Sequence, residues 1–458
     1  MGTNIKFRKL LYILVFTFIT GWFYSYSEFG KFYIEDLNSL YKYRKTQKLF
    51  IKPFYKHGPL TEHLMCSQFF YQNFTFDSKE RISRVIKNEL LSLTCDSIKK
   101  RRYFSPVPLS EEEKNFPLAY SFLVYKEYEF IELILSLIYQ PQNVYCFAID
   151  RKQDSTFRSR IHSLSNCFEN VFVSDIEYAI DSYGSHYSTS HIECIKKLKG
   201  YNWKYIFLLQ NHDFPMKTNA ELVEILKLFK DTSDFKAAKG LSHILNQNLD
   251  WTIKGLNFFP DNSLIDKQIL NTNISIAKGY SEVTISHAAI DYILNNINIT
   301  TYQSNYDKYP KFGSDELFWS TLFSNYEYLK IPGTLPKQCI HTSNALFSFT
   351  RLSKWNYRKN ATICPSGFKR HSICILGLEF ISQLEYLPHF FANKLMDNFD
   401  AGAVDCWAER VFNRTFYAEE YRKIDLSPYL SRPQIHFQEF LKNSDNISHF
   451  NCEKIYAK

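Results

Sequence analysis

The sequence lacks the motifs by which several large enzyme classes are recognised. It contains no Gly-x-Gly-x-x-Gly dinucleotide fingerprint, no phosphate-binding P-loop, no Gly-x-Ser-x-Gly nucleophile elbow and no His-Glu-x-x-His zinc motif. The sequence therefore gives no motif that would indicate a redox-cofactor enzyme, a P-loop NTPase, a serine hydrolase or a zincin. The ten cysteines include no Cys-x-x-Cys pair and no Cys/His cluster at zinc spacing, which argues against a zinc site.

A strong charge of one sign is also absent. The chain carries 55 Lys+Arg against 47 Asp+Glu, a net charge of +8 at pH 7, and no basic stripe stands out. Hydrophobic residues make up 45% of the chain and charged residues 22%, which excludes an intrinsically disordered protein. We therefore expect a folded protein that does not bind nucleic acid.

Only one apolar run approaches the length of a membrane span. It is about fifteen residues long, near the lower limit for a spanning helix. A cleaved signal peptide would end in small residues, whereas a signal-anchor suits bulky aromatic residues at the membrane interface. Basic residues precede this run and aromatic residues end it (Lys6, Arg8, Lys9, Trp22, Phe23). We predict a cytosolic tail at 1–9 and a transmembrane signal-anchor at 10–26, with the rest of the chain lumenal or extracellular.

The dispersed cysteines and the glycosylation sequons agree with such a compartment. In an oxidising compartment, scattered cysteines are most simply structural disulfides, although the sequence alone does not give their pairing. Asn-x-Ser/Thr sequons would be glycan acceptors there. They occur at Asn73, Asn273, Asn298, Asn360, Asn413 and Asn446.

Hydrophobic patterning divides the lumenal part of the chain. Residues 27–115 are expected to form a stem that packs partly on the catalytic domain. Apolar runs alternate with helical segments from residue 117 onward, which predicts an α/β domain at 116–440 whose mostly parallel sheet is covered on both faces, followed by a tail at 441–458. Ligands of such sheets bind beyond the carboxyl ends of the strands. Asp150 and the segment 211–215 follow two of these strands.

Carboxylates at two places could carry chemistry. Asp150 follows a buried strand and could accept hydrogen bonds from a ribose or a uracil, or could simply cap a turn. Asp315 and Glu316 precede an apolar helical stretch. Such residues often only complement the helix dipole, but a carboxylate held beside Phe and Trp can also act as a general base.

Cations and aromatic side chains lie near the C-terminal end of the domain. Arg370 and Lys394 stand between apolar residues and are either solvated or able to stabilise a pyrophosphate without a metal ion. Trp355 and Tyr357 offer an aromatic platform for a sugar ring, or belong to ordinary core packing.

The sequence around these residues, in its order along the chain, resembles the core-2/I-branching β-1,6-N-acetylglucosaminyltransferases, which belong to a family that also contains peptide O-xylosyltransferases. The resemblance covers residues 119–410. The matching stretches are Tyr139–Cys146 through Asp150, Cys167–Val173, Asn202–Tyr205, Asp213–Asn219, Ser314–Glu316 through Trp319, Lys354–Tyr357, Ser372–Ile375 and Phe391–Lys394.

The resemblance implies a GT-A-like fold, a type II Golgi membrane topology and an inverting transfer from a UDP-sugar without a cofactor or metal. Glu316 matches the catalytic base, Asp150 the nucleotide-contacting acid and Lys394 one of the cations beneath the diphosphate. The family's other cation is an Arg directly before Ser372, where this chain has His371. We assign that role to Arg370, one place earlier.

The resemblance further implies acceptor contacts by Trp355 and Tyr357. It also implies the disulfide pairs Cys66–Cys406, Cys95–Cys167, Cys146–Cys194 and Cys364–Cys374. Cys339 and Cys452 have no family counterparts, so they either pair with each other, remain free or link two chains in a homodimer.

We therefore expect a Golgi membrane enzyme that transfers N-acetylglucosamine from UDP-GlcNAc to the 6-hydroxyl of a sugar on a glycoprotein O-glycan. One alternative is a related transferase that uses UDP-xylose or UDP-glucuronate. Another is a catalytically silent, membrane-anchored protein that binds glycans.

Overall fold

The structure is a computed structural model of the 458-residue chain. It describes residues 52–71, 76, 81–84, 91–240, 245–309, 311–341, 347–356, 364–444 and 446–452. The chain divides into two compact units, Met1–Pro53 and Phe54–Lys458, and the description below concerns the second. This unit includes segments of the expected stem and tail, whose boundaries at 115 and 440 stay predictions.

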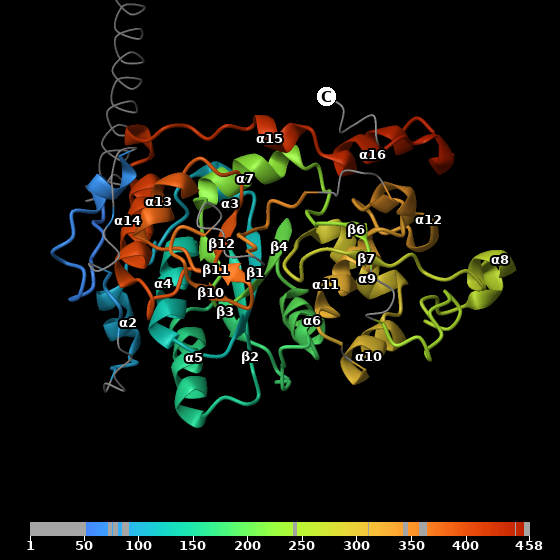
Figure 1. The fold of residues 1–458 in the computed structure, drawn as a ribbon, viewed down its shortest axis with the longest axis horizontal. Helices are drawn as coiled ribbons and strands as arrows, with labels where there is room; N and C mark the ends of the chain where they lie inside the picture. The colour runs from blue at the N-terminus through green and yellow to red at the C-terminus, as the bar shows by residue number, and fades with distance from the viewer. Residues whose placement is uncertain are drawn as a thin grey trace, which may run out of the picture. The chain divides into compact units, whose positions relative to one another are not determined.

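A five-stranded sheet forms the centre of the unit (Figure 1). Its order is β3-β2-β1-β4-β8, in which the first four strands are parallel and β8 is antiparallel to β4. The bounds are β1 Leu118–Val124, β2 Val144–Ile149, β3 Val171–Val173, β4 Tyr205–Gln210 and β8 Thr284–Ser286. The expectation of an α/β domain with a mostly parallel sheet is confirmed.

Alternate residues of the strands enter two separate cores because successive side chains of a strand point to opposite faces. Tyr120 and Phe122 of β1 belong to one buried cluster, and Ala119 and Leu123 belong to the other. Helices α4, α5 and α14 contribute to the first cluster, and α6, α9 and α11 to the second, so helices cover both faces (Figure 1). This explains why the parallel strands are apolar throughout.

The remaining elements form smaller sheets and helices around this centre. The other strands are β5 Phe214–Pro215, β6 Ala238–Lys239, β7 Ala277–Lys278, β9 Arg351–Ser353, β10 Lys369–Arg370, β11 Ile373–Cys374 and β12 Phe391–Asn393. The α-helices are α2 Cys95–Arg101, α3 Glu111–Lys114, α4 Tyr128–Ile138, α5 Ser155–Cys167, α6 Tyr187–Leu198, α7 Asn219–Leu228, α8 Lys267–Leu270, α9 His287–Asn296, α10 Thr300–Lys308, α11 Asp315–Phe323, α12 Tyr326–Leu329, α13 Leu378–Leu384, α14 Ala401–Phe416, α15 Ser427–Leu430 and α16 Pro433–Leu441.

Disulfides tie distant parts of the chain to this scaffold. The structure contains every pair that the resemblance implied, namely Cys66–Cys406, Cys95–Cys167, Cys146–Cys194 and Cys364–Cys374. Cys339 and Cys452 are bonded to each other, which is one of the three outcomes considered from the sequence. The Cys339–Cys452 bond joins the 3-10 helix Lys337–His341 to the C-terminal segment.

Some predicted features lie outside the described residues. These are the signal-anchor at 10–26, the acceptor-site Tyr357, and the sequons at Asn73 and Asn360. Within the part of the chain that the structure describes, none of the helices has the length and apolar character that crossing a membrane requires. Among the remaining sequons, Asn273 and Asn446 are exposed, whereas Asn298 and Asn413 are half-buried.

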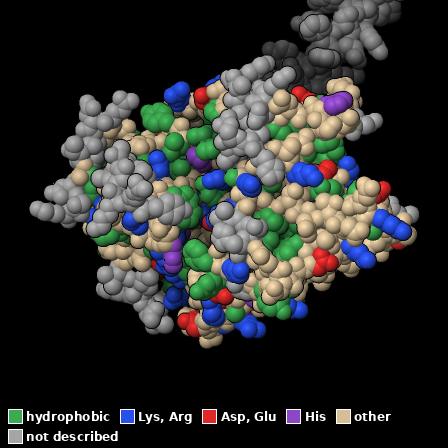
Figure 2. All heavy atoms as spheres, turned by 45° about the vertical axis from the view of Figure 1, so that its right-hand side comes forward, with side chains coloured by type: hydrophobic (Ala, Val, Ile, Leu, Met, Phe, Trp, Pro, Cys, Tyr) green, Lys and Arg blue, Asp and Glu red, His purple; other side chains and the backbone are tan. Residues whose placement is uncertain are grey.

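Charged side chains are distributed without a single dominant stripe on the face that Figure 2 presents, where Lys and Arg are interspersed with acidic, polar and hydrophobic side chains.

Inside the molecule, one carboxylate, Asp405 of α14, fixes the segment that precedes the disulfide-bonded Cys66. It accepts hydrogen bonds from the hydroxyls of Tyr55 and Thr61 and from the backbone N–H of Gly58, and it lies 3.5 Å from Nδ1 of His57.

His57 is expected to make the stability of this segment depend on pH. Hydrogen bonds to Asp405 and Glu409 raise the pKa of His57 from 6.5 to about 9. The native state therefore binds the proton more tightly, so this stabilisation is complete below pH 6.5 and is lost as the pH rises to about 9. We expect His57→Gln to lower the free energy of unfolding by about 1–2 kcal/mol at pH 6, after allowance for solvent screening.

Urea unfolding of the wild-type and His57→Gln chains at pH 6 and at pH 9.5 measures this difference. Because all other titrating groups are common to both chains, their contributions cancel in the comparison. A deficit of equal size at both pH values would show that the His57 side chain acts through packing and not through its charge.

Candidate active site

A cavity of about 570 Å³ opens at the carboxyl ends of the parallel strands. It is lined by Val124 at the end of β1, by Asp150 directly after β2 and by Gln210 at the end of β4. This is the edge of an open parallel sheet where ligands bind, because the loops that follow the strands leave a crevice there. The structure therefore has a cavity at the position that the sequence predicted for a ligand.

The predicted site residues converge on this cavity, although the sequence separates them widely. All of them line it except Tyr357, which lies outside the described residues: Asp150, Glu316, Trp355, Arg370 and Lys394. The fold thus brings the proposed base, the nucleotide-contacting acid and the cations into one space. Their chemical roles stay proposals.

Glu316 reaches the cavity from the first turn of α11. Gly313, which precedes this turn, has φ +82°, a left-handed conformation that suits glycine. The Oε2 atom of Glu316 lies 2.8 Å from Nζ of Lys278, and the glutamate side chain is 21% exposed. Lys278 thus pairs with Oε2 of Glu316, and both side chains line the cavity.

Asp315, the neighbour of Glu316, lies in a different environment. Burial, followed by the charges of Glu316 and Glu282, raises the pKa of Asp315 to about 7. Gly184 packs against it so closely that a Cβ on this glycine would lie 2.6 Å from Cβ of Asp315. Asp315 is therefore fixed against Gly184 at the start of α11, and both Asp315 and Glu316 line the cavity.

Asp150 stabilises a turn and also lines the cavity. Its Oδ1 atom accepts hydrogen bonds from the backbone N–H groups of Lys152 (3.1 Å) and Ile180 (3.4 Å), which is a turn-stabilising role. Its Oδ2 atom lies 3.4 Å from Nζ of Lys152, and both side chains line the cavity. The carboxylate is therefore fixed in place and still presented to a ligand.

Three cations line one part of the cavity: Arg351, Arg370 and Lys394. Arg351 is neutralised by buried carboxylates, since its Nη1 atom lies 2.5 Å from Glu282 and 3.8 Å from Asp213. Lys394 has no such partner among the described residues. Burial, together with the charges of Arg351 and Arg370, lowers the pKa of Lys394 to about 8. An anion bound next to Lys394 would supply the charge that it lacks.

Arg370 and His371 sit on a small hairpin formed by β10 and β11. Both side chains line the cavity, and His371 occupies the left-handed turn with φ +51°. Burial and the positive charges of Lys394 and Arg370 lower the pKa of His371, which favours its neutral form. Arg370 is therefore the cation of this hairpin that lines the cavity, and its role beneath the diphosphate stays a proposal.

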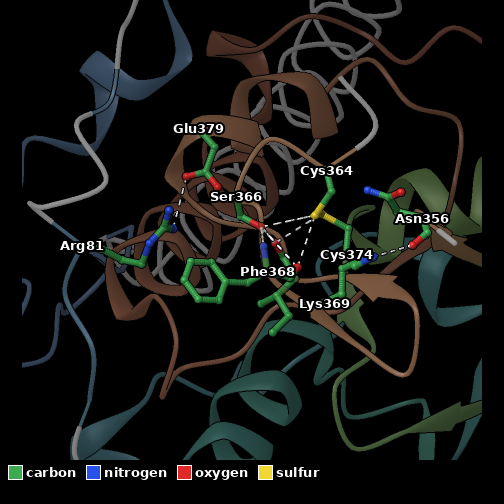
Figure 3. The surroundings of a disulfide bond; sticks show 9 residues. Arg81, Asn356, Cys364, Ser366, Phe368, Lys369, Cys374 and Glu379 are labelled. Atoms are coloured by element: carbon green, nitrogen blue, oxygen red, sulfur yellow. Dashed lines mark hydrogen bonds and ion pairs between the residues drawn. A yellow bond between two sulfur atoms is a disulfide. The ribbon is translucent and has the colours of Figure 1, made fainter. Parts of the chain in front are cut away.

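The Cys364–Cys374 disulfide closes the loop that carries this hairpin (Figure 3). Ser366 Oγ donates a hydrogen bond to the carbonyl of Ile375 (2.6 Å), and Lys369 Nζ donates one to the carbonyl of Asn356 (3.0 Å). The backbone N–H of Asn356 in turn donates to the carbonyl of Ser372 (2.9 Å). These bonds hold the hairpin against the segment that contains Trp355.

Arg351 belongs to a buried polar network that was not predicted as a whole from the sequence. Glu282 accepts hydrogen bonds from the Tyr187 hydroxyl (3.0 Å) and from the Gln210 side chain, in addition to its pairing with Arg351. Asn393, the residue before Lys394, donates a hydrogen bond to Oδ1 of Asp213 (2.7 Å). Asp213 and Asn393 lie in stretches that match the family, whereas Glu282 lies in none of them, so the sequence marked only part of this network.

The cavity wall also contains an exposed aromatic ring, Phe312, that was not predicted as a site residue. Phe312 lines the cavity with 68% of its surface exposed, and it meets the ring of Tyr183 edge-on at 6.3 Å. Trp355, in contrast, is half-buried and pairs with Ile373 of β11. Exposed rings at the mouth of a cavity, of which Phe312 is the clearest case, provide a surface on which an apolar face of a sugar can rest.

Among the described residues, one group of potential metal ligands was found, and it lies outside this cavity. It consists of His57, Cys66 and Glu409, and Cys66 is already bonded to Cys406. The thiolate that a metal would require is therefore not available at that group.

Comparison with known proteins agrees with the resemblance. Residues 118–385 match the family described as Core-2/I-Branching enzyme. A β-1,3-galactosyl-O-glycosyl-glycoprotein β-1,6-N-acetylglucosaminyltransferase of Bos taurus is 30% identical over 353 residues, which cover 74% of this chain and 80% of the relative. The human protein with the same name is 30% identical over 327 residues, or 69% and 74% of the two chains, and a Danio rerio relative is 29% identical over 345 residues, or 73% and 79%. The chain therefore belongs to the Core-2/I-branching enzyme family of glycosyltransferases.

Proposed function

We propose that this chain transfers N-acetylglucosamine from UDP-GlcNAc to the 6-hydroxyl of a sugar on a glycoprotein O-glycan, which forms a β-1,6 branch. The observation that carries the proposal is a single cavity that contains a glutamate at the start of α11 and a half-buried lysine, Lys394, which has no carboxylate partner among the described residues. The names of the bovine and human relatives supply the donor sugar, the acceptor class and the linkage.

The proposed reaction is a single displacement. The acceptor oxygen attacks the anomeric carbon of the donor, its proton passes to Glu316, and the bond to UDP breaks with its electron pair moving to the diphosphate. Lys394 and Arg370 stabilise the charge that develops on the diphosphate, which is where preorganised cations lower the barrier most. Because attack and departure occur on opposite faces of the sugar, the configuration at the anomeric carbon inverts.

The remaining cavity residues position the two substrates in this proposal. Asp150 accepts hydrogen bonds from the nucleoside, and Trp355 and Tyr357 contact the acceptor. The sheet order with ligand binding at the carboxyl strand ends supports a GT-A-like fold. The basic flank and the apolar run at 10–26 support a type II Golgi membrane protein with the catalytic unit in the lumen.

A donor assay tests this function directly. Purified full-length chain is offered UDP-GlcNAc, UDP-xylose and UDP-glucuronate together with a galactosyl-β-1,3-N-acetylgalactosaminyl acceptor, and the products are identified by mass spectrometry and NMR. We expect a product only with UDP-GlcNAc, in β-1,6 linkage. Transfer from UDP-xylose or UDP-glucuronate would indicate the related transferases, and binding of the glycan without any transfer would indicate a silent relative.

Because side-chain cations are assigned the role of a metal ion in this mechanism, we expect chelation to leave the activity unchanged. The initial rate with excess EDTA should equal the rate without it. The control is a metal-dependent glycosyltransferase assayed in the same buffer. A loss of activity that Mn²⁺ restores would contradict the role given to Lys394 and Arg370.

A further inference from the structure

A second cavity of about 330 Å³ lies elsewhere in the unit. Its walls come from residues 217–221 around the start of α7, from the segment 385–388, from α14 and from residues 420–429. It shares no lining residue with the 570 Å³ cavity. Its size is at the lower end of the range of small-molecule sites, about 300–1,000 Å³.

Lys217 is the unusual residue of this second cavity. It is 4% exposed, and its ammonium donates one hydrogen bond, to the carbonyl of Leu387 (2.7 Å). No carboxylate of the described residues forms an ion pair with it. Burial lowers the pKa of Lys217 to about 8. Buried lysines are rare without a carboxylate partner. Lys217 lines the cavity and donates one hydrogen bond to the described residues, so its ammonium has donor capacity left for a ligand.

The other charged side chains that line the cavity balance in number. Arg410 donates to Glu385 from Nε (3.2 Å) and from Nη2, which lies 2.6 and 2.8 Å from the two carboxylate oxygens. Nη2 of Arg414 donates to both carboxylate oxygens of Glu221, at 2.6 Å from Oε1. The remaining charged lining residues are exposed, and two are acidic and two basic (Glu420, Arg422, Lys423, Asp425), so the charge of Lys217 is left over. The cavity is therefore suited to a ligand with a single negative charge.

Rings form much of the remaining wall. The cavity is lined by Tyr386, Tyr421, Tyr429, Pro388 and Pro428. Tyr386 is 61% exposed, and the guanidinium of Arg410 lies 4.5 Å from the ring centroid of Tyr421, which fixes that ring. Flat tyrosine and proline surfaces favour a compact ring with apolar faces over a flexible chain.

We propose that this cavity is a second glycan-binding site that holds a monosaccharide bearing one carboxylate, with the carboxylate at Lys217 and the sugar ring against the tyrosine and proline surfaces. The site binds and performs no chemistry. It is independent of the transfer reaction, since it shares no residue with the proposed active site. Such a site would let the enzyme engage an acidic sugar on a glycan while the other cavity is occupied by UDP.

Methyl β-D-glucuronide and methyl β-D-glucoside test the proposal because they differ only in the carboxylate. Binding to the full-length chain is measured by calorimetry in saturating UDP, which fills the first cavity. One charge-assisted hydrogen bond is worth about 1.5–3 kcal/mol, so we expect the glucuronide to bind about 10- to 100-fold more tightly than the glucoside. Equal affinities, or displacement of the glucuronide by UDP, would overturn the proposal.

Two variants locate the binding. Lys217→Met removes the charge at nearly the same volume and is expected to lower glucuronide affinity about 10-fold or more, while UDP binding reports that the chain is folded. If Lys217→Met does not fold, Tyr386→Ala tests the location of the site instead, because the exposed ring of Tyr386 can be removed without disturbing the core. We expect Tyr386→Ala to weaken glucuronide binding several-fold. Tyr309→Ala, which removes another exposed ring (50% exposed) outside the cavity, should have no effect. Full glucuronide affinity in Lys217→Met or in Tyr386→Ala would overturn the assignment.

Discussion

Replacing Glu316 by Gln is expected to lower the rate of transfer by about 100- to 10,000-fold, the range that a general base contributes. Gln has the same shape but cannot accept the proton of the acceptor hydroxyl. Glu316 touches the cavity through the first turn of α11, away from Asp150 at the end of β2. The affinity for UDP should therefore stay within about twofold of the wild-type value, measured by calorimetry, while kcat falls.

The control for this experiment is Glu439→Gln, since Glu439 is an exposed residue of α16 that pairs with Lys230 on the surface. It should transfer at the wild-type rate. A Glu316→Gln chain that turns over as fast as the wild type would remove the base from the mechanism. Weak UDP binding in Glu316→Gln would instead indicate that the substitution disturbs the cavity as a whole.

Replacing Lys394 by Met is expected to lower kcat by about 100- to 1,000-fold, because one preorganised donor at a developing charge is worth this much. The effect should exceed that of Arg370→Met, since burial and neighbouring positive charges lower the pKa of Lys394, which has no carboxylate partner among the described residues. Steady-state kinetics with UDP-GlcNAc measures both variants. The exposed Lys196→Met, on α6, serves as the control because Lys196 pairs only with Glu193.

The pKa of Lys394 gives this prediction a pH signature. Because burial and nearby arginines lower this pKa to about 8, the lysine is charged below pH 8 and loses its proton above it. We expect transfer by the wild type to decline above about pH 8, whereas Lys394→Arg keeps its charge and should show no decline there. A decline of the same size in Lys394→Arg would assign the alkaline limb to another group.

Much of the architecture was predictable from local patterns. The strand Val144–Ile149 and the strand Tyr205–Gln210 are continuous apolar runs, and only a parallel sheet covered on both faces buries such runs completely. The start of α7 was predictable as well, because Thr218 and Glu221 form a capping box whose reciprocal hydrogen bonds involve neighbours in sequence.

The site was predictable only where a motif marks it. Glu316 and Lys394 lie in stretches that match the family, so they could be named before their positions were known. Lys278, Phe312 and the buried Glu282 reach the same region from segments without a matching motif. The pairing of Cys339 with Cys452 belongs to the same category, because several arrangements satisfied the sequence equally well.

The sequence by itself determined the family, the sheet and the identity of the groups proposed for catalysis, since apolar periodicity and ordered motifs are properties of neighbouring residues. Only the tertiary structure decided the charge balance of those groups. Arg351 is compensated by Glu282 and Asp213, whereas the half-buried Lys394 and the buried Lys217 have no carboxylate partners among the described residues. Whether a cation in the interior is paired depends on side chains from segments that are distant in the sequence. The local sequence pattern does not show which of these segments lie next to it.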